Sequence, residues 1–272
     1  MTQVNIKSEK EIALMRKAGL LAWEAHQIAA SMVRPGVTTG EINAAIERYF
    51  AEHKAIPLFK GVPSSTGNVP FPAAACISVN EQLVHGIPGP RVLKEGDVVS
   101  IDLGCKLNGW CSDAAVTHPV GKVSPKVQRL LDVTEGTLRL AIELIPQKKR
   151  WSEVARELEA YVKAAGFSVV EGLVGHGIGR NMHEDPQVPN YVNLSYEALG
   201  DFPLKPGLVI AVEPMVTMSS KKLKTLNDHW TIVAADGHPT AHFEHTLAIT
   251  RHGVEVLTAG PHGEGWAMTA RD

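Results

Sequence analysis

The sequence LKEGDVVSID at residues 93–102 is echoed by LKPGLVIAVE at residues 204–213, an offset of 111 positions. In both segments an apolar run follows a Lys-x-Gly turn, which is typical of a β-strand. Pro35 precedes an expected helix, and Pro146 precedes another that begins near Ser152; these prolines are also 111 positions apart. Two agreeing offsets indicate an internal repeat.

The repeat predicts the domain organisation. A looser echo links VHGI at residues 84–87 with GHGI at residues 175–178. A chain of 272 residues is long enough for one domain with a sizeable core. We therefore expect a single domain over residues 1–272, made of two similar halves at about 8–120 and 121–258.

One acid in each echoed segment lies on the polar face of its expected strand. Side chains alternate along a strand, so Val99 and Ile101 lie opposite Asp102, and Ile210 lies opposite Glu213. An acid within an apolar strand is unusual, because burying an unpaired carboxylate is costly. Two half-sheets related by a pseudo-twofold axis would bring both acids to one centre.

Two helices are expected near the N-terminus because each begins with a capping box. Ser8 with Glu11 forms the first box, and Thr38 with Glu41 forms the second. Apolar residues recur at helical spacing after Ser8 and continue to about Val33. The first half therefore begins with two helices, followed by strands.

Two glycine-containing turns place the remaining acids. Asn108-Gly109 predicts a turn after the Asp102 strand, and Asp113 follows that turn. Asp236-Gly237 predicts a hairpin between strands at residues 230–234 and 240–250. Glu244 lies on the second of these strands, on the face that it shares with His242 and Thr246.

The bulk properties predict an ordinary globular protein. The net charge of −2 offers no electrostatic basis for binding nucleic acid or an anionic membrane. The sequence has neither an apolar run of the ~20 residues that span a bilayer nor a signal-peptide core. Its three cysteines contain no CxxC pair, which favours a reducing, cytoplasmic location.

The acids and histidines indicate a metal centre. Asp102, Asp113, Glu213 and Glu244 would together neutralise two divalent cations, and carboxylates can bridge such a pair. His176 adds a nitrogen ligand, and the glycines on either side of it allow close approach to a ligand. This donor set suits Co, Mn, Fe or Zn. Neither HExxH nor Gly-x-Ser-x-Gly is present, so mononuclear zinc proteases and serine hydrolases have little support.

From about residue 9 to residue 257 the chain resembles type I methionine aminopeptidases, whose pita-bread fold is α+β. That fold has two pseudo-symmetric halves with a curved antiparallel sheet covered by helices. The motifs that carry the resemblance are CISVNE at 76–81, HGIP at 85–88, IDLG at 101–104, SD at 112–113, GHGIG at 175–179, HEDP at 183–186, EPM at 213–215 and EHT at 244–246.

The resemblance implies a role for each metal ligand. Asp102 would bind one metal through both oxygens, and Asp113 and Glu244 would bridge two divalent ions. His176 and Glu213 would complete the ligand set of the other metal. The implied reaction removes the N-terminal methionine of nascent proteins and peptides, favours a small second residue and uses Glu213 as proton acceptor.

The resemblance also implies a substrate pocket. The residues expected to contact substrate are Phe71, Cys76, His85, Met182, His183 and Trp230, with His183 near the scissile carbonyl. The family usually has aromatic residues near the positions of Asn68 and Met182, Tyr at Phe71 and His at Cys111. The shape of the pocket is therefore the part of the resemblance that this sequence follows least closely.

Two alternatives share the fold. Proline-specific peptidases (aminopeptidase P or prolidase) have the same metal set but usually carry an additional N-terminal domain. Non-enzymatic binding proteins typically lose metal ligands, and all five are present here. We expect a monomer with a peptide N-terminus as substrate and no nucleic-acid or membrane partner. Transient docking on the ribosome is a hypothesis that no strong basic patch supports.

Overall fold

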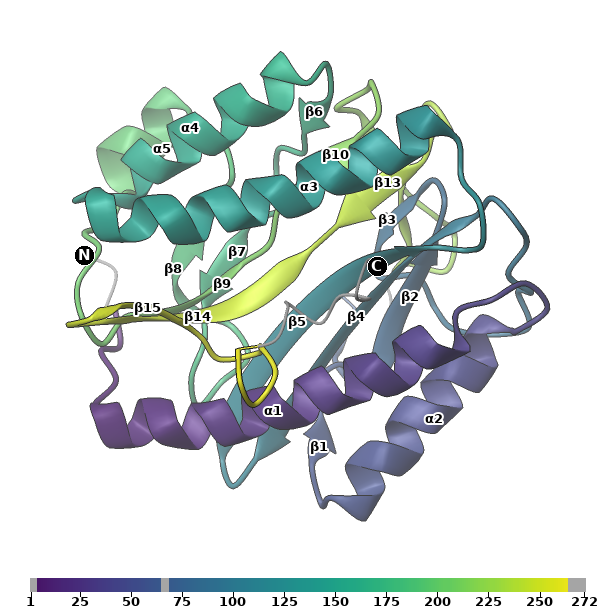
Figure 1. Cartoon of the computed structure of the whole chain (residues 1–272), viewed down its shortest axis with the longest axis horizontal. Helices are drawn as coiled ribbons and strands as arrows, with labels where there is room; N and C mark the ends of the chain where they lie inside the picture. The colour runs from purple at the N-terminus through teal and green to yellow at the C-terminus, as the bar shows by residue number, and fades with distance from the viewer. Residues whose placement is uncertain (1–3, 65–68, 264–272) are drawn as a thin grey trace.

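The computed structural model describes residues 4–64 and 69–263, and it consists of a curved sheet with helices on one face (Figure 1). The helices are α1 (Glu9–Met32), α2 (Thr39–Glu52), α3 (Pro125–Leu144), the 3₁₀ turn η1 (Ile145–Gln147), α4 (Trp151–Ala164) and α5 (Leu194–Leu199). None of the helices in the described part of the chain has the length and apolar character needed to span a bilayer.

The strands form one large sheet and two small ones. The large antiparallel sheet has the order β1-β4-β5-β14-β9-β7-β8, with β15 paired to β14 and β2 paired to β4. Its strands are β1 (Ile56–Pro57), β2 (Ala75–Val79), β4 (Val98–Leu107), β5 (Trp110–Pro119), β7 (Gly175–Gly177), β8 (Glu184–Val188), β9 (Val209–Val212), β14 (Glu244–Thr250) and β15 (Gly253–Val256). The small sheets have the orders β13-β10-β6 and β11-β12-β3. Their strands are β3 (Gln82–Val84), β6 (Ser168–Val169), β10 (Met215–Thr217), β11 (Leu223–Thr225), β12 (Ile232–Ala234) and β13 (Thr240–His242).

Both predicted capping boxes are present. The Ser8 backbone N–H donates to the Glu11 carboxylate, and the Thr38 backbone N–H donates to the Glu41 carboxylate. These bonds satisfy amides that helix formation leaves without an intrahelical partner. Helix α1 ends at Met32, one residue before the predicted end.

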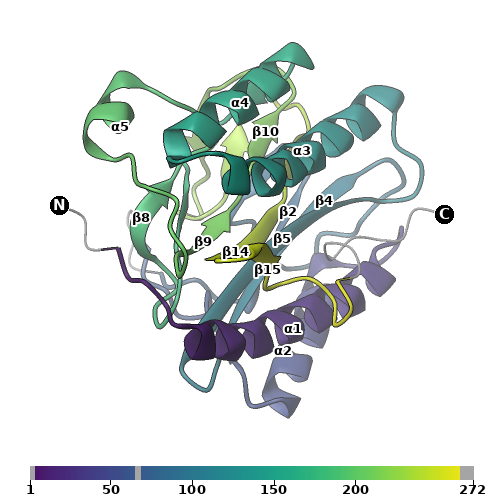
Figure 2. The ribbon, with the colours of Figure 1, turned by 60° about the vertical axis from the view of Figure 1, so that its left-hand side comes forward.

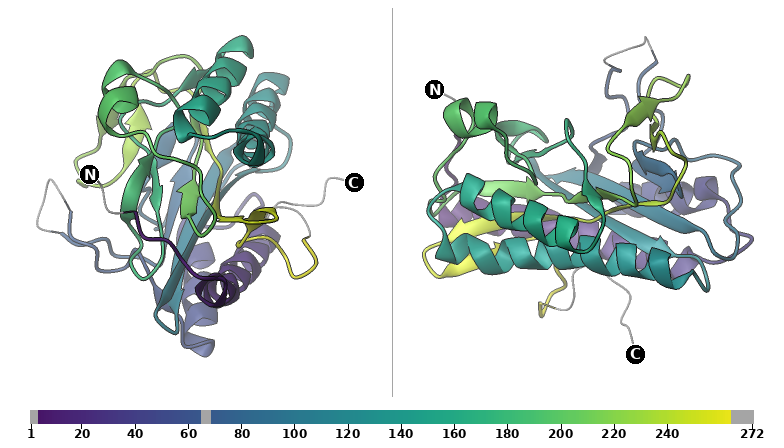
Figure 3. Two further views of the ribbon diagram at one scale, coloured as in Figure 1. Left: turned by 90° about the vertical axis from the view of Figure 1, so that its left-hand side faces the viewer. Right: turned by 90° about the horizontal axis from the view of Figure 1, so that it is seen from above.

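The predicted strand faces are confirmed by the core. Val99, Ile101 and Leu103 on β4 lie in a buried cluster with residues of α1 and α2. Ile210 and Val212 on β9 lie in a second cluster with residues of α3 and α4. Each helix pair therefore covers the apolar face of its strands and leaves the opposite face to the acids. Figures 2 and 3 show the two pairs, distant in sequence, over the two ends of one sheet.

The Asn108-Gly109 turn is confirmed. Leu107 pairs with Trp110 across it, so the loop has two residues. Asn108 has φ 50° and Gly109 has φ 84°, the positive pair that a type I′ hairpin turn requires.

The hairpin predicted at Asp236-Gly237 is wrong. β12 pairs with β11 and β3, whereas β13 pairs with β10, so the two strands do not pair with each other. The chain does turn, but the Asp236 carboxylate accepts hydrogen bonds from Ser219 and Ser220. Pro239, immediately before β13, also has no N–H to donate to a ladder. The expected strand 240–250 is divided into β13 and β14 at Phe243.

Candidate metal centre and substrate cavity

The sheet register places the acids in two neighbouring rows. Directly opposed residues of antiparallel strands share a face. Cys76 pairs with Asp102, Asp102 with Ala115, and Ala115 with Glu244, which forms the first row across β2, β4, β5 and β14. His245 pairs with Val212, so the same register carries this row on to Glu213.

The second row lies beside the first. His176 pairs with Ala211, and Ala211 pairs with Thr246. The Thr246 hydroxyl then accepts a hydrogen bond from the Asp113 backbone N–H at 3.0 Å and donates one to the Asp113 carbonyl at 2.8 Å. Gly104 is opposite Asp113, and a Cβ there would lie 2.8 Å from Asp113 Oδ1, so glycine leaves room for the carboxylate.

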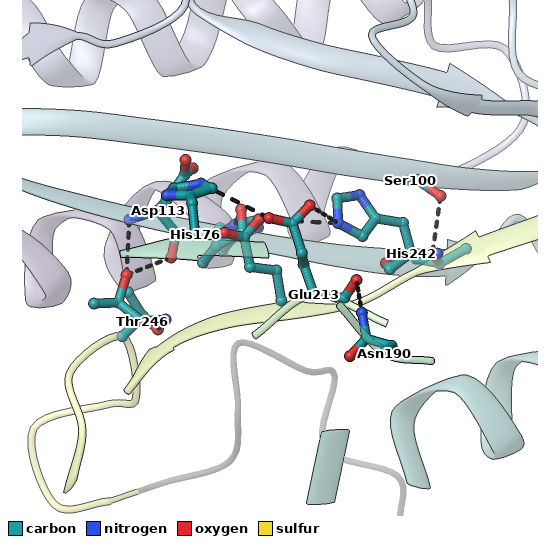
Figure 4. Close-up of polar contacts among 12 residues, drawn as sticks. Ser100, Asp113, His176, Asn190, Glu213, His242 and Thr246 are labelled. Carbon is teal, nitrogen blue, oxygen red and sulfur yellow. Dashed lines mark hydrogen bonds and ion pairs between the residues drawn. The ribbon is translucent and has the colours of Figure 1, made fainter. Parts of the chain in front are cut away.

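The Glu213 carboxylate lies between two imidazoles (Figure 4). His176 Nε2 is 3.7 Å from Glu213 Oε1, and His242 Nε2 is 3.7 Å from Glu213 Oε2. His242 Nε2 is also 3.9 Å from Glu244 Oε2. Asn190 Nδ2 donates to the Glu213 carbonyl at 3.0 Å, which fixes the backbone just beyond β9.

The acids are buried without neutralising partners. Asp113 and Glu244 are only 3% and 2% exposed. Asp102 Oδ1, Asp113 Oδ1 and Glu244 Oε1 have no hydrogen-bond partner among the described residues. Burial raises the pKa of Asp113 to about 7. Burial and the neighbouring acids raise the pKa values of Asp102, Glu213 and Glu244 well above the ordinary range.

These carboxylate oxygens without hydrogen-bond partners are suited to bind divalent metal ions. Nearby cations favour the charged form of carboxylates and would reverse each of these pKa shifts. Potential ligand atoms of Asp113, His176 and Glu244 lie within 4.8 Å of one another, as do those of Glu213, His242 and Glu244. Asp102 lies outside both groups but is close enough to Asp113 and Glu213 for their charges to raise its pKa.

The histidines are held in the neutral form. Burial lowers the pKa of His176 to about 4, and His183 adds to the effect, although backbone hydrogen bonds to Gly177 and Met182 oppose it. Burial likewise lowers the pKa of His85 to about 4. His183 is more open, and partial burial lowers its pKa as well. A neutral imidazole offers one nitrogen lone pair to a metal and one N–H to a substrate oxygen.

A cavity of about 670 Å³ opens over the two rows. Every residue predicted for the site lines it: Phe71, Cys76, His85, Asp102, Asp113, His176, Met182, His183, Glu213, Trp230 and Glu244. The fold thus brings the predicted set together, and the individual roles stay predictions. Asn68 lies outside the described residues. Cys111 is buried, with its Sγ 3.5 Å from the Arg180 carbonyl.

One end of the cavity is apolar. Phe71 and Trp230 meet edge to face with centroids 5.2 Å apart, and Phe59 and Cys76 belong to the same cluster. The Trp230 indole N–H donates to the Val69 carbonyl at 2.9 Å, which fixes the ring. This apolar end adjoins the acids through Cys76, which is paired with Asp102.

Several residues of the cavity were not predicted from the sequence. His242 faces Glu213 and Glu244, and neither ring nitrogen has a hydrogen-bond partner among the described residues. The sequence did contain a signal for His242, because strand alternation placed it on the same face as Glu244. Met215 was detectable within the Glu213-Pro214-Met215 motif. Phe59 and Val62 carried no signal because they lie in irregular chain after β1.

Residues 13–251 match the metallopeptidase family M24, and the chain belongs to this family. It is 47% identical over 254 residues to a methionine aminopeptidase of Clostridium perfringens, covering 93% of this chain and 98% of the relative. It is 44% identical over 252 residues to methionine aminopeptidase 1 of Bacillus subtilis, with the same coverage.

The fold of this chain is also similar to that of a solved structure. The methionine aminopeptidase of Thermotoga maritima superimposes with a TM-score of 0.86 at 38% identity, covering 94% of this chain and 99% of that one. The expected α+β pita-bread fold, with its curved antiparallel sheet covered by helices, is therefore confirmed.

Proposed function

We propose that this chain is a metal-dependent aminopeptidase that removes the N-terminal methionine of peptides and nascent proteins, favouring a small second residue. The observation that carries the proposal is the junction of two surfaces in one cavity. A row of under-neutralised carboxylates adjoins an apolar pocket lined by Phe71 and Trp230. The relatives named methionine aminopeptidase support this substrate.

The five ligands would be Asp102, Asp113, His176, Glu213 and Glu244, holding two divalent ions of Co, Mn, Fe or Zn. When bound, such ions supply a water of lowered pKa as nucleophile and polarise the substrate carbonyl. The orphaned oxygens of Asp102, Asp113 and Glu244 support this donor set. A soft, apolar pocket suits a methionine side chain, and Met182 at its edge can adapt to it.

The protein's own groups would manage the protons. Glu213, whose carboxylate lies between the His176 and His242 rings, is placed to accept the proton of the attacking water and return it to the leaving amine. His183, kept neutral, would donate an N–H to the carbonyl oxygen as negative charge develops there. His85, 6.3 Å from the Trp230 ring between centroids, would contact the peptide where the apolar pocket meets the acids.

We also propose the cytoplasm as the working compartment and a monomer as the working form. The three cysteines are free thiols, which suits a reducing environment. Transient docking on the ribosome remains part of this proposal, since nascent chains would supply the substrate.

A substrate comparison tests the proposal. Purified protein with each candidate metal should hydrolyse Met-Ala-Ser far faster than a peptide that begins Xaa-Pro. Preference for Xaa-Pro would establish the proline-specific alternative instead, and metal binding without hydrolysis of either peptide would establish a binding protein.

The metal ligands are tested separately. Asp113→Ala or Glu244→Ala should lose metal and activity together, because each removes a carboxylate that faces the other ligands. Metal content by elemental analysis is the measurement, with thermal unfolding as the check on folding. Full activity and two retained metals in either variant would refute the ligand assignment.

A further inference from the structure

The loop at residues 179–183, which leads into β8, carries two cavity residues, Met182 and His183. Its His183 ring meets the His176 ring edge to face, with centroids 4.4 Å apart. The position of this loop therefore sets the geometry of a ligand and of a substrate-contacting residue.

Glu184, the first residue of β8, also lines the cavity and accepts hydrogen bonds from the backbone of this loop. Its Oε1 accepts the backbone N–H groups of Arg180 at 2.9 Å and Asn181 at 3.2 Å. Its other oxygen accepts hydrogen bonds from Lys7 Nζ at 2.7 Å and from Asn5 Nδ2 at 3.2 Å. One carboxylate thus joins the loop to a segment more than 170 residues away in sequence.

The Lys7–Glu184 pair is buried, with both side chains 5% exposed. Burial alone would raise the pKa of Glu184, but hydrogen bonds from Lys7 and the Asn181 backbone lower it below its ordinary value. Ion pairs at surfaces contribute little, whereas breaking a buried one leaves an uncompensated charge. Lys7 is therefore a structural constraint on the loop rather than a solvated surface charge.

Two glycines make room for this contact. A Cβ on Gly179 would lie 2.6 Å from Lys7 Cε and 2.7 Å from Glu184 Oε1. Gly207, in the turn before β9, has φ 91°, and a Cβ there would lie 2.7 Å from the Lys7 carbonyl. The Lys7 N–H donates to the Gly207 carbonyl at 2.7 Å, so the turn that starts the Glu213 strand also holds Lys7.

We propose that Lys7, although it does not line the cavity, is a positioning residue for the reaction: through Glu184 it fixes the loop that places His183 against the substrate. This inference rests on the proposed function for its kinetic part. It predicts that losing the Lys7 ammonium displaces His183 and slows turnover while metal remains bound.

The test uses Lys7→Met, which removes the charge and keeps a long side chain. Lys10→Met is the matched control, because Lys10 is exposed in the first turn of α1. With Met-Ala-Ser, Lys7→Met should lower kcat about tenfold to 10²-fold, as sub-ångström to ångström misplacement of catalytic groups does. Metal content should be unchanged, the ¹⁵N ring signals of His183 should shift, and Lys10→Met should match the parent protein.

A double variant, Lys7→Met with Glu184→Gln, separates positioning from instability. It removes the unpaired buried charge, so thermal stability should recover while kcat stays low and the His183 signals stay shifted. A Lys7→Met kcat within twofold of the parent, or recovery of kcat together with stability in the double variant, overturns the inference. If the parent cleaves no methionyl peptide, the proposed function fails, and the His183 ring signals still decide the role of Lys7.

Discussion

The strand that carries Asp102 and the strand that leads to Glu213 begin with similar sequences but hold their acids differently. β4 is ten residues long, and Asp102 lies within it, paired to Cys76 on one side and Ala115 on the other. β9 has four residues and ends at Val212. Glu213 therefore lies just outside the ladder, before Pro214, with the Asn190 amide on its carbonyl.

This difference separates two demands on a carboxylate. A group that only holds a cation benefits from rigid backbone on both sides, as Asp102 has. Glu213 has ladder pairs on one side only, and the Asn190 amide holds its backbone on the other. Under the proposed function, we therefore predict that Asp102 only binds metal and that Glu213 also transfers a proton.

The largest effect should come from exchanging each acid for its amide. Glu213→Gln removes the proton acceptor, and kcat should fall about 10²- to 10⁴-fold, a loss that added metal does not recover. Asp102→Asn should act mainly through metal affinity, so raising the metal concentration should restore much of its activity. Titration calorimetry measures the metal affinity of each variant, and kcat at several metal concentrations measures how far added metal restores its activity. Identical behaviour of the two variants would break the comparison.

A smaller effect should follow from loosening the backbone beside Glu213. Asn190→Ala removes the hydrogen bond to the Glu213 carbonyl, and kcat should fall roughly tenfold, as losses of groups that orient ligands do. Asn193→Ala, which removes the N-cap of α5, is the control for a nearby asparagine change. An Asn190→Ala enzyme as fast as the control would show that the strand end holds Glu213 without this amide.

The smallest effect concerns the helix-covered side of the first region, where His26 of α1 and His118 of β5 are buried. Burial lowers their pKa values to about 4 and about 3, with the His26 charge contributing at His118. An unfolded histidine titrates near 6.5, so below that pH the unfolded chain binds protons that the folded chain excludes. Stability should therefore fall as pH decreases from about 6.5 toward 4.

Each such histidine contributes at most about 1.4 kcal/mol per pH unit to the free energy of unfolding. Thermal unfolding of His118→Gln and the parent protein between pH 7.5 and 5 isolates one contribution, because the carboxylates and His245 titrate in both. The variant should lose less stability on acidification. Parallel curves for the two proteins would mean that His118 has the same pKa in the folded and unfolded chains.

Local signals made much of the fold predictable. The capping boxes at Ser8 and Thr38 and the Asn108-Gly109 turn depend on residues within four positions of one another, and each formed as expected. The strand faces followed from alternation, which placed Asp102 and Glu213 opposite the core. The family resemblance then supplied the roles of the site residues, which alternation cannot provide.

Long-range pairing was less accessible. The Asp236-Gly237 turn depends on neighbouring residues. The pairing of β12 with β3 and of β13 with β10 depends on distant strands, and the Asp236 side chain bonds to Ser219. Nothing near Lys7 in sequence indicates its pairing with Glu184, which lies 177 positions away. His242 was placed on the correct face, yet its proximity to Glu213 depends on how β13 leads into β14.

The position of β14 has a consequence for biosynthesis. This strand pairs with β5 on one edge and β9 on the other, although it is made after both. While a chain is being translated, the edge of β5 that faces the centre has no partner, and unpaired edges invite association with other chains. Glu244 at the start of β14 is the last predicted ligand to leave the ribosome. Occupancy of the full predicted ligand set would therefore mark a chain that has been translated beyond the start of β14.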